Sequence, residues 1–151
     1  MTGVVKGILI AVVVVVLVIA IGLGVGIYWI ASRGPAFVEK SKQSVAEGER
    51  FGRETDNQGC VNETLARHKQ NPDFSGALAN QLFLTTCLQR SKATPGFCDL
   101  VPHRTEFIKS AEWQVEQCAK NDLHDSYCRQ IFAQVEAFCD MRAAREEKDN
   151  Q

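Results

Sequence analysis

The stretch "CAKNDLHDSYC", residues 118–128, decides how the C-terminal half of the chain folds, because it places two cysteines at the ends of a polar segment. Amphipathic segments flank it on both sides, so we expect it to be the turn of a helical hairpin. Cys118 and Cys128 are equidistant from the middle of that turn, near Leu123. Antiparallel helices would bring them level, within the Cα separation of about 7 Å that a disulfide requires. We therefore predict that Cys118 and Cys128 are joined.

A zinc site is the alternative for the same stretch. Cys118, His124 and Cys128 would supply three ligands, and Asp122 or Asp125 would supply a fourth. Zinc sites usually contain cysteine or histidine pairs with about two to four residues between them, and the chain has no C-x-x-C. The same absence argues against a thioredoxin-like redox pair. We therefore expect neither a metal nor a cofactor.

The cysteines as a set indicate where the protein resides. All six lie after residue 59, and their even number in a small domain indicates a disulfide framework formed in an oxidising compartment. Six reduced thiols in a cytosolic core are the alternative, because free cysteine behaves as a small apolar residue. The framework would consist of Cys60, Cys87, Cys98, Cys118, Cys128 and Cys139.

The remaining pairs follow from a second turn. Cys60 and Cys87 are equidistant from a turn near Asp73, so we predict a disulfide between them. Cys98 and Cys139 are then left to close the open end of the other hairpin. A rival set joins Cys87 to Cys98 and Cys60 to Cys139.

Apolar residues recur with helical spacing in four segments, and no window alternates with period two. The segments cover residues 60–69, 76–90, 105–120 and 125–145. We expect an all-α domain over residues 56–145, built from two disulfide-closed helical hairpins. Asp125 and Ser126 are expected to cap the last helix.

The third segment carries a stripe that we interpret as the apolar face of its helix. The stripe comprises Phe107, Ile108, Ala111, Val115 and Cys118. Trp113 lies off this stripe, because two residues along a helix turn about 200°. We expect Trp113 either to pack between the hairpins or to offer an aromatic anchor to a partner.

The N-terminal part reads as a membrane anchor with a stalk. After a tail over residues 1–6, the apolar run 7–31 predicts a single-pass transmembrane helix, and it is too long for a cleaved signal peptide. Residues 32–55 are charged and read as a partly helical stalk, and residues 146–151 as a charged tail.

Small residues and flanking charges add two expectations about the anchor. Gly22 and Gly26 lie one turn apart, a spacing that lets two membrane helices approach closely, so a homodimer could form there. More basic residues follow the run than precede it, which weakly favours a cytoplasmic domain. The cysteines favour the opposite side, periplasmic or extracellular, and we give them more weight.

Function is expected to be binding and not catalysis. The net charge is −1 without a basic stripe, which excludes an electrostatic footprint for nucleic acid. The consecutive residues His124, Asp125 and Ser126 diverge and cannot form a triad, and His68 and His103 read as surface residues. We predict a membrane-anchored, extracytoplasmic interaction or accessory module whose partner is another membrane or extracytoplasmic protein. The alternative, a lipid- or small-ligand-binding helical domain, would show an apolar pocket above about 300 Å³.

Overall fold

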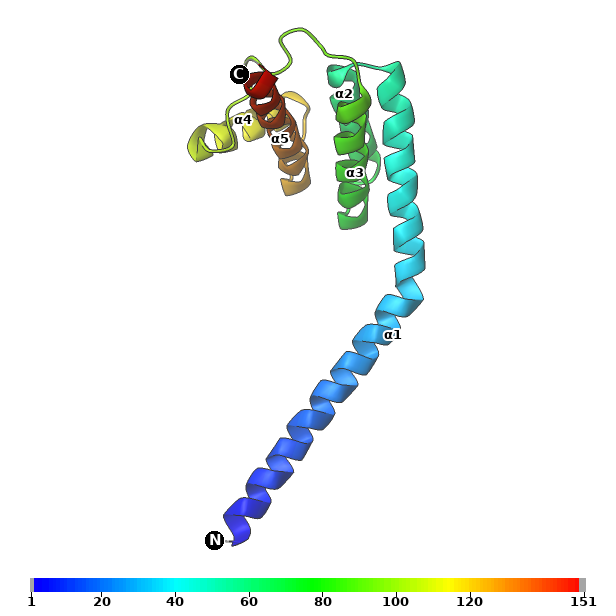
Figure 1. Cartoon of the computed structure of the whole chain (residues 1–151), viewed down its shortest axis with the longest axis vertical. Coiled ribbons are helices and arrows are strands. Elements are labelled where there is room, and N and C mark those ends of the chain that lie inside the picture. The colour runs from blue at the N-terminus through cyan, green and yellow to red at the C-terminus, as the bar shows by residue number, and fades with distance from the viewer. Residues whose placement is uncertain (1, 150–151) are drawn as a thin grey trace. The chain divides into compact units, whose positions relative to one another are not determined.

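The computed structural model describes the backbone of residues 2–149, with side chains described for residues 13–26, 28 and 38–149. Five α-helices make up the secondary structure of this described part (Figure 1). The all-α prediction is therefore confirmed. The helices are α1 (Thr2–Glu54), α2 (Asn57–Gln70), α3 (Phe74–Arg90), α4 (Phe107–Lys120) and α5 (Ser126–Asp149). The chain divides into two compact units, residues 1–39 and residues 40–151.

The first unit corrects the prediction of a transmembrane helix over residues 7–31. Among the described residues, no helix is both long enough and apolar enough to cross a membrane. Nor does the helix end at Gly34 and Pro35, because α1 continues to Glu54. The side chains of the rest of the run, except that of Tyr28, lie outside the described residues.

The paired glycines of this unit have no neighbours in the structure. No atom lies within 4 Å of the position that a Cβ would occupy at Gly22 or Gly26, apart from those of the helix's own nearby backbone and the adjoining residues.

The second unit begins earlier than the sequence suggested. We predicted a stalk over residues 32–55, but residues 40–54 of α1 belong to the compact unit and pack along α3. A Cβ at Gly48 would lie 2.5 Å from the carbonyl oxygen of Phe83, and a Cβ at Gly52 would lie 2.6 Å from that of Cys87. The two glycines therefore allow the backbones of α1 and α3 to approach closely.

Helices α2 and α3 form the first predicted hairpin, beside residues 40–54 of α1 (Figure 1). The side chain of Asp73 accepts a hydrogen bond from the backbone of Gly76 at 2.7 Å, so it caps α3. Helix α3 consequently begins two residues before the predicted start at Gly76. Cys60 and Cys87 join the hairpin, with 5.8 Å between their Cα atoms.

Helices α4 and α5 form the second hairpin, and its turn ends α4 in a Schellman motif. Asp122 adopts a left-handed φ of 57°, and the backbone N–H of Leu123 donates to the carbonyl of Cys118 at 3.0 Å. The Asp125 carboxylate then accepts hydrogen bonds from the backbones of Tyr127 and Cys128, which confirms Asp125 as a cap of α5.

The remaining disulfides complete the framework. Cys118 is bonded to Cys128, and Cys98, in the loop between α3 and α4, is bonded to Cys139 on α5. With Cys60–Cys87 these are the pairs that we predicted, two from turn geometry and Cys98–Cys139 by elimination, so the rival set is wrong. The core lies between α2, α3 and α5, and its apolar members besides the cysteines are Val61, Leu65, Phe83, Leu84, Leu88, Ile131, Phe132 and Val135.

Candidate functional site

Helix α4 packs on α5 through a polar face. The carboxylate of Glu136 on α5 is buried, with 1% of the residue exposed. Its Oε2 accepts hydrogen bonds from Ser110 Oγ and Gln114 Nε2, both at 2.9 Å. Its Oε1 has no hydrogen-bond partner among the described residues. These bonds fix the central part of α4 with Ser110 and Gln114 turned inward.

Two further contacts fix the rotation of α4 about its own axis. The ring of Trp113 meets that of Phe132 edge-on, with 5.6 Å between centroids. At the end of α4, Cys118 is bonded to Cys128. Trp113 therefore packs within the second hairpin, although the sequence placed it off the apolar stripe.

The outer face of α4 is apolar and exposed. Phe107 is 80% exposed, Ile108 is 75% exposed, Val115 is 51% exposed, and Ala111 between them is exposed as well. These four residues, here called the α4 outer stripe, are the stripe that the sequence predicted, without the buried Cys118. The interpretation of the stripe as the packed face of its helix is wrong for these four residues, because hydrogen bonds to Glu136 turn the neighbouring face, which carries Ser110 and Gln114, inward.

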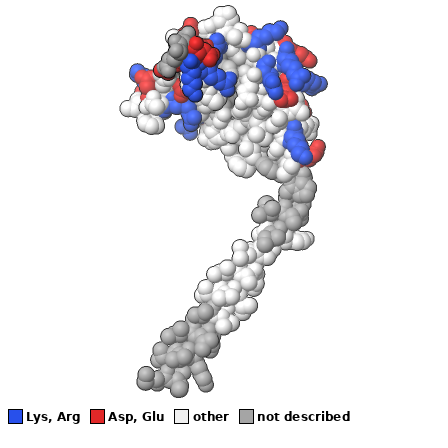
Figure 2. Space-filling view, in the orientation of Figure 1, with Lys and Arg blue, Asp and Glu red and all other residues white. Residues whose placement is uncertain are grey.

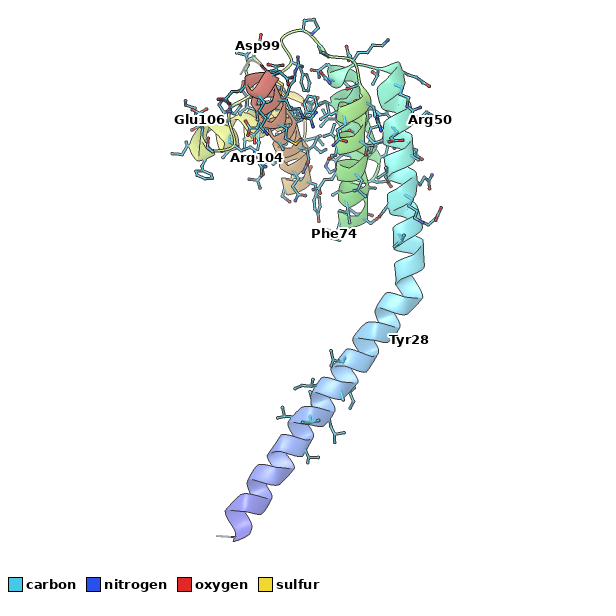
Figure 3. The ribbon with its side chains drawn as sticks, in the orientation of Figure 1. Tyr28, Arg50, Phe74, Asp99, Arg104 and Glu106 are labelled. Atoms are coloured by element: carbon cyan, nitrogen blue, oxygen red, sulfur yellow. A yellow bond between two sulfur atoms is a disulfide. The ribbon has the colours of Figure 1, made fainter. Side chains whose placement is uncertain are left out.

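Helix α4, which carries this stripe, lies at one end of the compact unit (Figure 1). Helix α4 lies on the far side of α5 from α3 in Figure 1, and its only described helix neighbour is α5. Figure 3 labels Arg104 and Glu106 just before the start of α4, and it labels Phe74 separately at the start of α3. Figure 2 shows uncharged surface at the α4 end of the unit, between patches of both signs.

Charged residues lie beside the α4 outer stripe. Glu116 pairs with Lys120 at 2.8 Å, and both side chains are more than half exposed. Glu112 is exposed and has no ion pair within residues 38–149. One edge of the stripe thus carries a free carboxylate.

The grooves of the compact unit are open and shallow. A groove of about 290 Å³ runs between α4 and the loop before it, where Leu100 and Trp113 contribute apolar walls. A second groove measures about 350 Å³ and is lined by polar Asn57 and Ser91 as well as by Phe138. Both are open to solvent, so neither is the enclosed apolar cavity expected of a ligand carrier.

A buried histidine joins the two hairpins, which the sequence did not reveal. His68 on α2 is fully buried, and its Nε2 lies 3.0 Å from both carboxylate oxygens of Asp125. Partial burial raises the pKa of Asp125, but the hydrogen bonds from His68, Cys128 and Tyr127 outweigh it, so the pKa is lowered overall. The expectation that His68 is a surface residue is therefore wrong.

The structure also separates the residues that the sequence offered as zinc ligands. His124 is exposed in the turn, and Cys118 and Cys128 are bonded to each other, so their sulfurs cannot serve as zinc thiolates. Within the described residues no group of three acidic, histidine or cysteine side chains could hold a metal ion. His68 pairs with Asp125 through Nε2, and its Nδ1 has no hydrogen-bond partner among the described residues. No hydroxyl or thiol there is therefore placed to act as a nucleophile with this histidine.

Comparison with known proteins gives no family: no protein-family model, no curated protein and no solved structure matches this chain.

Proposed function

We propose that residues 40–149 form a binding module that docks on another protein through the α4 outer stripe. The observation that supports this is the orientation of α4, which turns Ser110 and Gln114 toward Glu136 and leaves Phe107 and Ile108 in solvent. A contiguous exposed apolar patch on a stable fold is typical of an interaction site. The Cys118–Cys128 disulfide and the Glu136 hydrogen bonds hold the helix in this orientation before any partner arrives.

The size of the stripe sets the strength of binding that we expect. Burying Phe107, Ile108 and Val115 would each contribute about 1.5–3 kcal/mol. Association itself costs about 4–15 kcal/mol of lost freedom. One helix face therefore supports a weak or transient complex, which is typical of an accessory or regulatory contact.

The disulfides support an oxidising, extracytoplasmic location for this module. Each of the six cysteines is paired and none is free. Such frameworks persist in secreted, periplasmic and cell-surface proteins, because cytosolic reductants remove them. The partner is accordingly proposed to be another extracytoplasmic protein. Lipid or small-ligand binding has less support, because the described grooves are open and partly polar.

The test is a comparison of two phenylalanine variants. Phe107 in the stripe and Phe74 at the start of α3 are both largely exposed, at 80% and 70%. Phe107→Ser and Phe74→Ser should therefore leave the fold equally intact. We expect Phe107→Ser to lose a cross-linked partner that the wild-type chain and Phe74→Ser both retain. Recovery of the same proteins with all three chains would contradict the proposal.

A further inference from the structure

The spacing of the α4 outer stripe suits packing against another helix. Phe107, Ala111 and Val115 follow one another at intervals of four residues, so they lie in one row along α4. Such rows interdigitate with the equivalent rows of a second helix. Helix α4 has 14 residues, but the row from Phe107 to Val115 extends over about 12 Å, so it matches a partner helix of little more than two turns.

A second row beside the stripe supplies charge. Glu112 and Glu116 each follow a stripe residue directly, so they lie about 100° around the helix from Ala111 and Val115. Glu116 is already paired with Lys120. Glu112 has no ion pair among residues 38–149, and a helix lying on the stripe would bring its own flanking residues next to this carboxylate.

A second copy of the same chain fits this surface poorly. The middle of the stripe is Ala111, so an antiparallel two-fold pairing would place the two Glu112 carboxylates next to the axis. A parallel two-fold pairing would place the two Glu112 side chains on opposite sides of the interface, each beside the partner flank that carries Ser110 and Gln114 and no cation. Like charges facing each other are unfavourable, so the surface selects a partner of opposite charge.

We infer that the partner presents an amphipathic helix whose apolar stripe is flanked by lysine or arginine, with one basic residue facing Glu112. This inference rests on the proposed function of the α4 outer stripe. It adds the chemistry of the partner, and it assigns Glu112 as a residue that determines specificity.

Two synthetic peptides test it against the full chain. Both carry the same leucine stripe at helical spacing, and one is flanked by lysine and the other by glutamate. The lysine peptide should bind about fivefold or more tightly than the glutamate peptide, the size of a favourable exposed ion pair. High salt should reduce this preference. Glu112→Gln should remove most of it, and Glu112→Lys should reverse it.

The outcomes separate the inference from the function on which it rests. Equal binding of both peptides, lost in Phe107→Ser, would overturn the charge preference and leave the stripe as the docking face. Binding that Phe107→Ser does not reduce would overturn the docking face itself. Binding of neither peptide, or a dimer of the chain that Phe107→Ser dissociates, would overturn the inferred partner. Binding of anionic phospholipid vesicles, without binding of the lysine peptide, would also overturn the inferred helical partner.

Discussion

His68 and Asp125 join the two helical hairpins through a contact that is buried on one side. The imidazole of His68 is fully buried on α2, and its Nε2 lies 3.0 Å from both carboxylate oxygens of Asp125, which also caps α5. The lowered pKa keeps that carboxyl ionised, so it only accepts and Nε2 must donate. This carboxylate therefore stabilises a helix start and a packing contact together.

Asp125→Ala should destabilise the compact unit by roughly 2–4 kcal/mol, because it removes a helix cap and leaves a buried imidazole nitrogen without a partner. Chemical denaturation would measure the loss. The matched control is the exposed pair of His103 and Asp140, at 2.8 Å, with His103 68% exposed. Asp140→Ala should cost less than about 1 kcal/mol. Equal costs for the two variants would contradict the role assigned to His68 and Asp125.

The same pair predicts how stability depends on pH. Because the pKa of Asp125 is lower in the folded chain than its usual value of 3.8, the unfolded state binds its proton first as pH falls. The stabilisation is fully present above that usual value and is lost as pH falls through it toward the folded pKa. Unfolding curves between about pH 6 and 2.5 should show Asp125→Asn losing less stability than the wild-type chain. Parallel curves would argue against the prediction.

Gly48→Ala should destabilise the compact unit even though alanine favours helix. The new Cβ would lie 2.5 Å from the carbonyl oxygen of Phe83, so α1 and α3 would have to separate. The expected strain of about 1–3 kcal/mol exceeds the gain in helix propensity of about 1 kcal/mol. Gly26→Ala is the control, because nothing lies near its Cβ position. A rise in melting temperature for Gly48→Ala would show that the two helices do not pack closely.

Replacing Cys118 and Cys128 together with serine should lower the free energy of unfolding by roughly 2–4 kcal/mol, because the disulfide no longer restricts the unfolded chain. Helix content at low temperature should be retained, as measured by circular dichroism. Peptide mapping without reductant should recover Cys118 linked to Cys128 in the wild-type protein. Free thiols at both positions would contradict the structure.

Several features could be predicted from sequence because they depend on local spacing. Cys60 and Cys87 flank one turn symmetrically, and Cys118 and Cys128 flank another, so hairpin geometry alone indicates their pairing. Asp125 was recognisable as a cap because a carboxylate just before an amphipathic segment satisfies its free N–H groups.

Other features could not be predicted because they depend on contacts between distant segments. Periodicity shows that α4 has an apolar face, but it does not show whether that face packs against the rest of this chain or stays exposed to a partner. Glu136, which turns Ser110 inward, lies 26 residues further along the chain. Glycine generally weakens a helix, but the one-turn spacing of Gly48 and Gly52 was a usable signal of close helix packing.

His68 follows Val61 by seven residues and Leu65 by three, so its place on the apolar face of α2 was a usable signal of burial. Its partner Asp125 was not predictable.

The most direct test of the α4 outer stripe as a docking face is site-specific photo-cross-linking in cells. A photoreactive phenylalanine analogue at Ile108, which is 75% exposed, samples the stripe, and the same analogue at Phe74 samples an exposed site elsewhere on the unit. Our account predicts a covalent adduct with a second protein from position 108 and none from position 74. No adduct at position 108, or the same adduct from both positions, would contradict it.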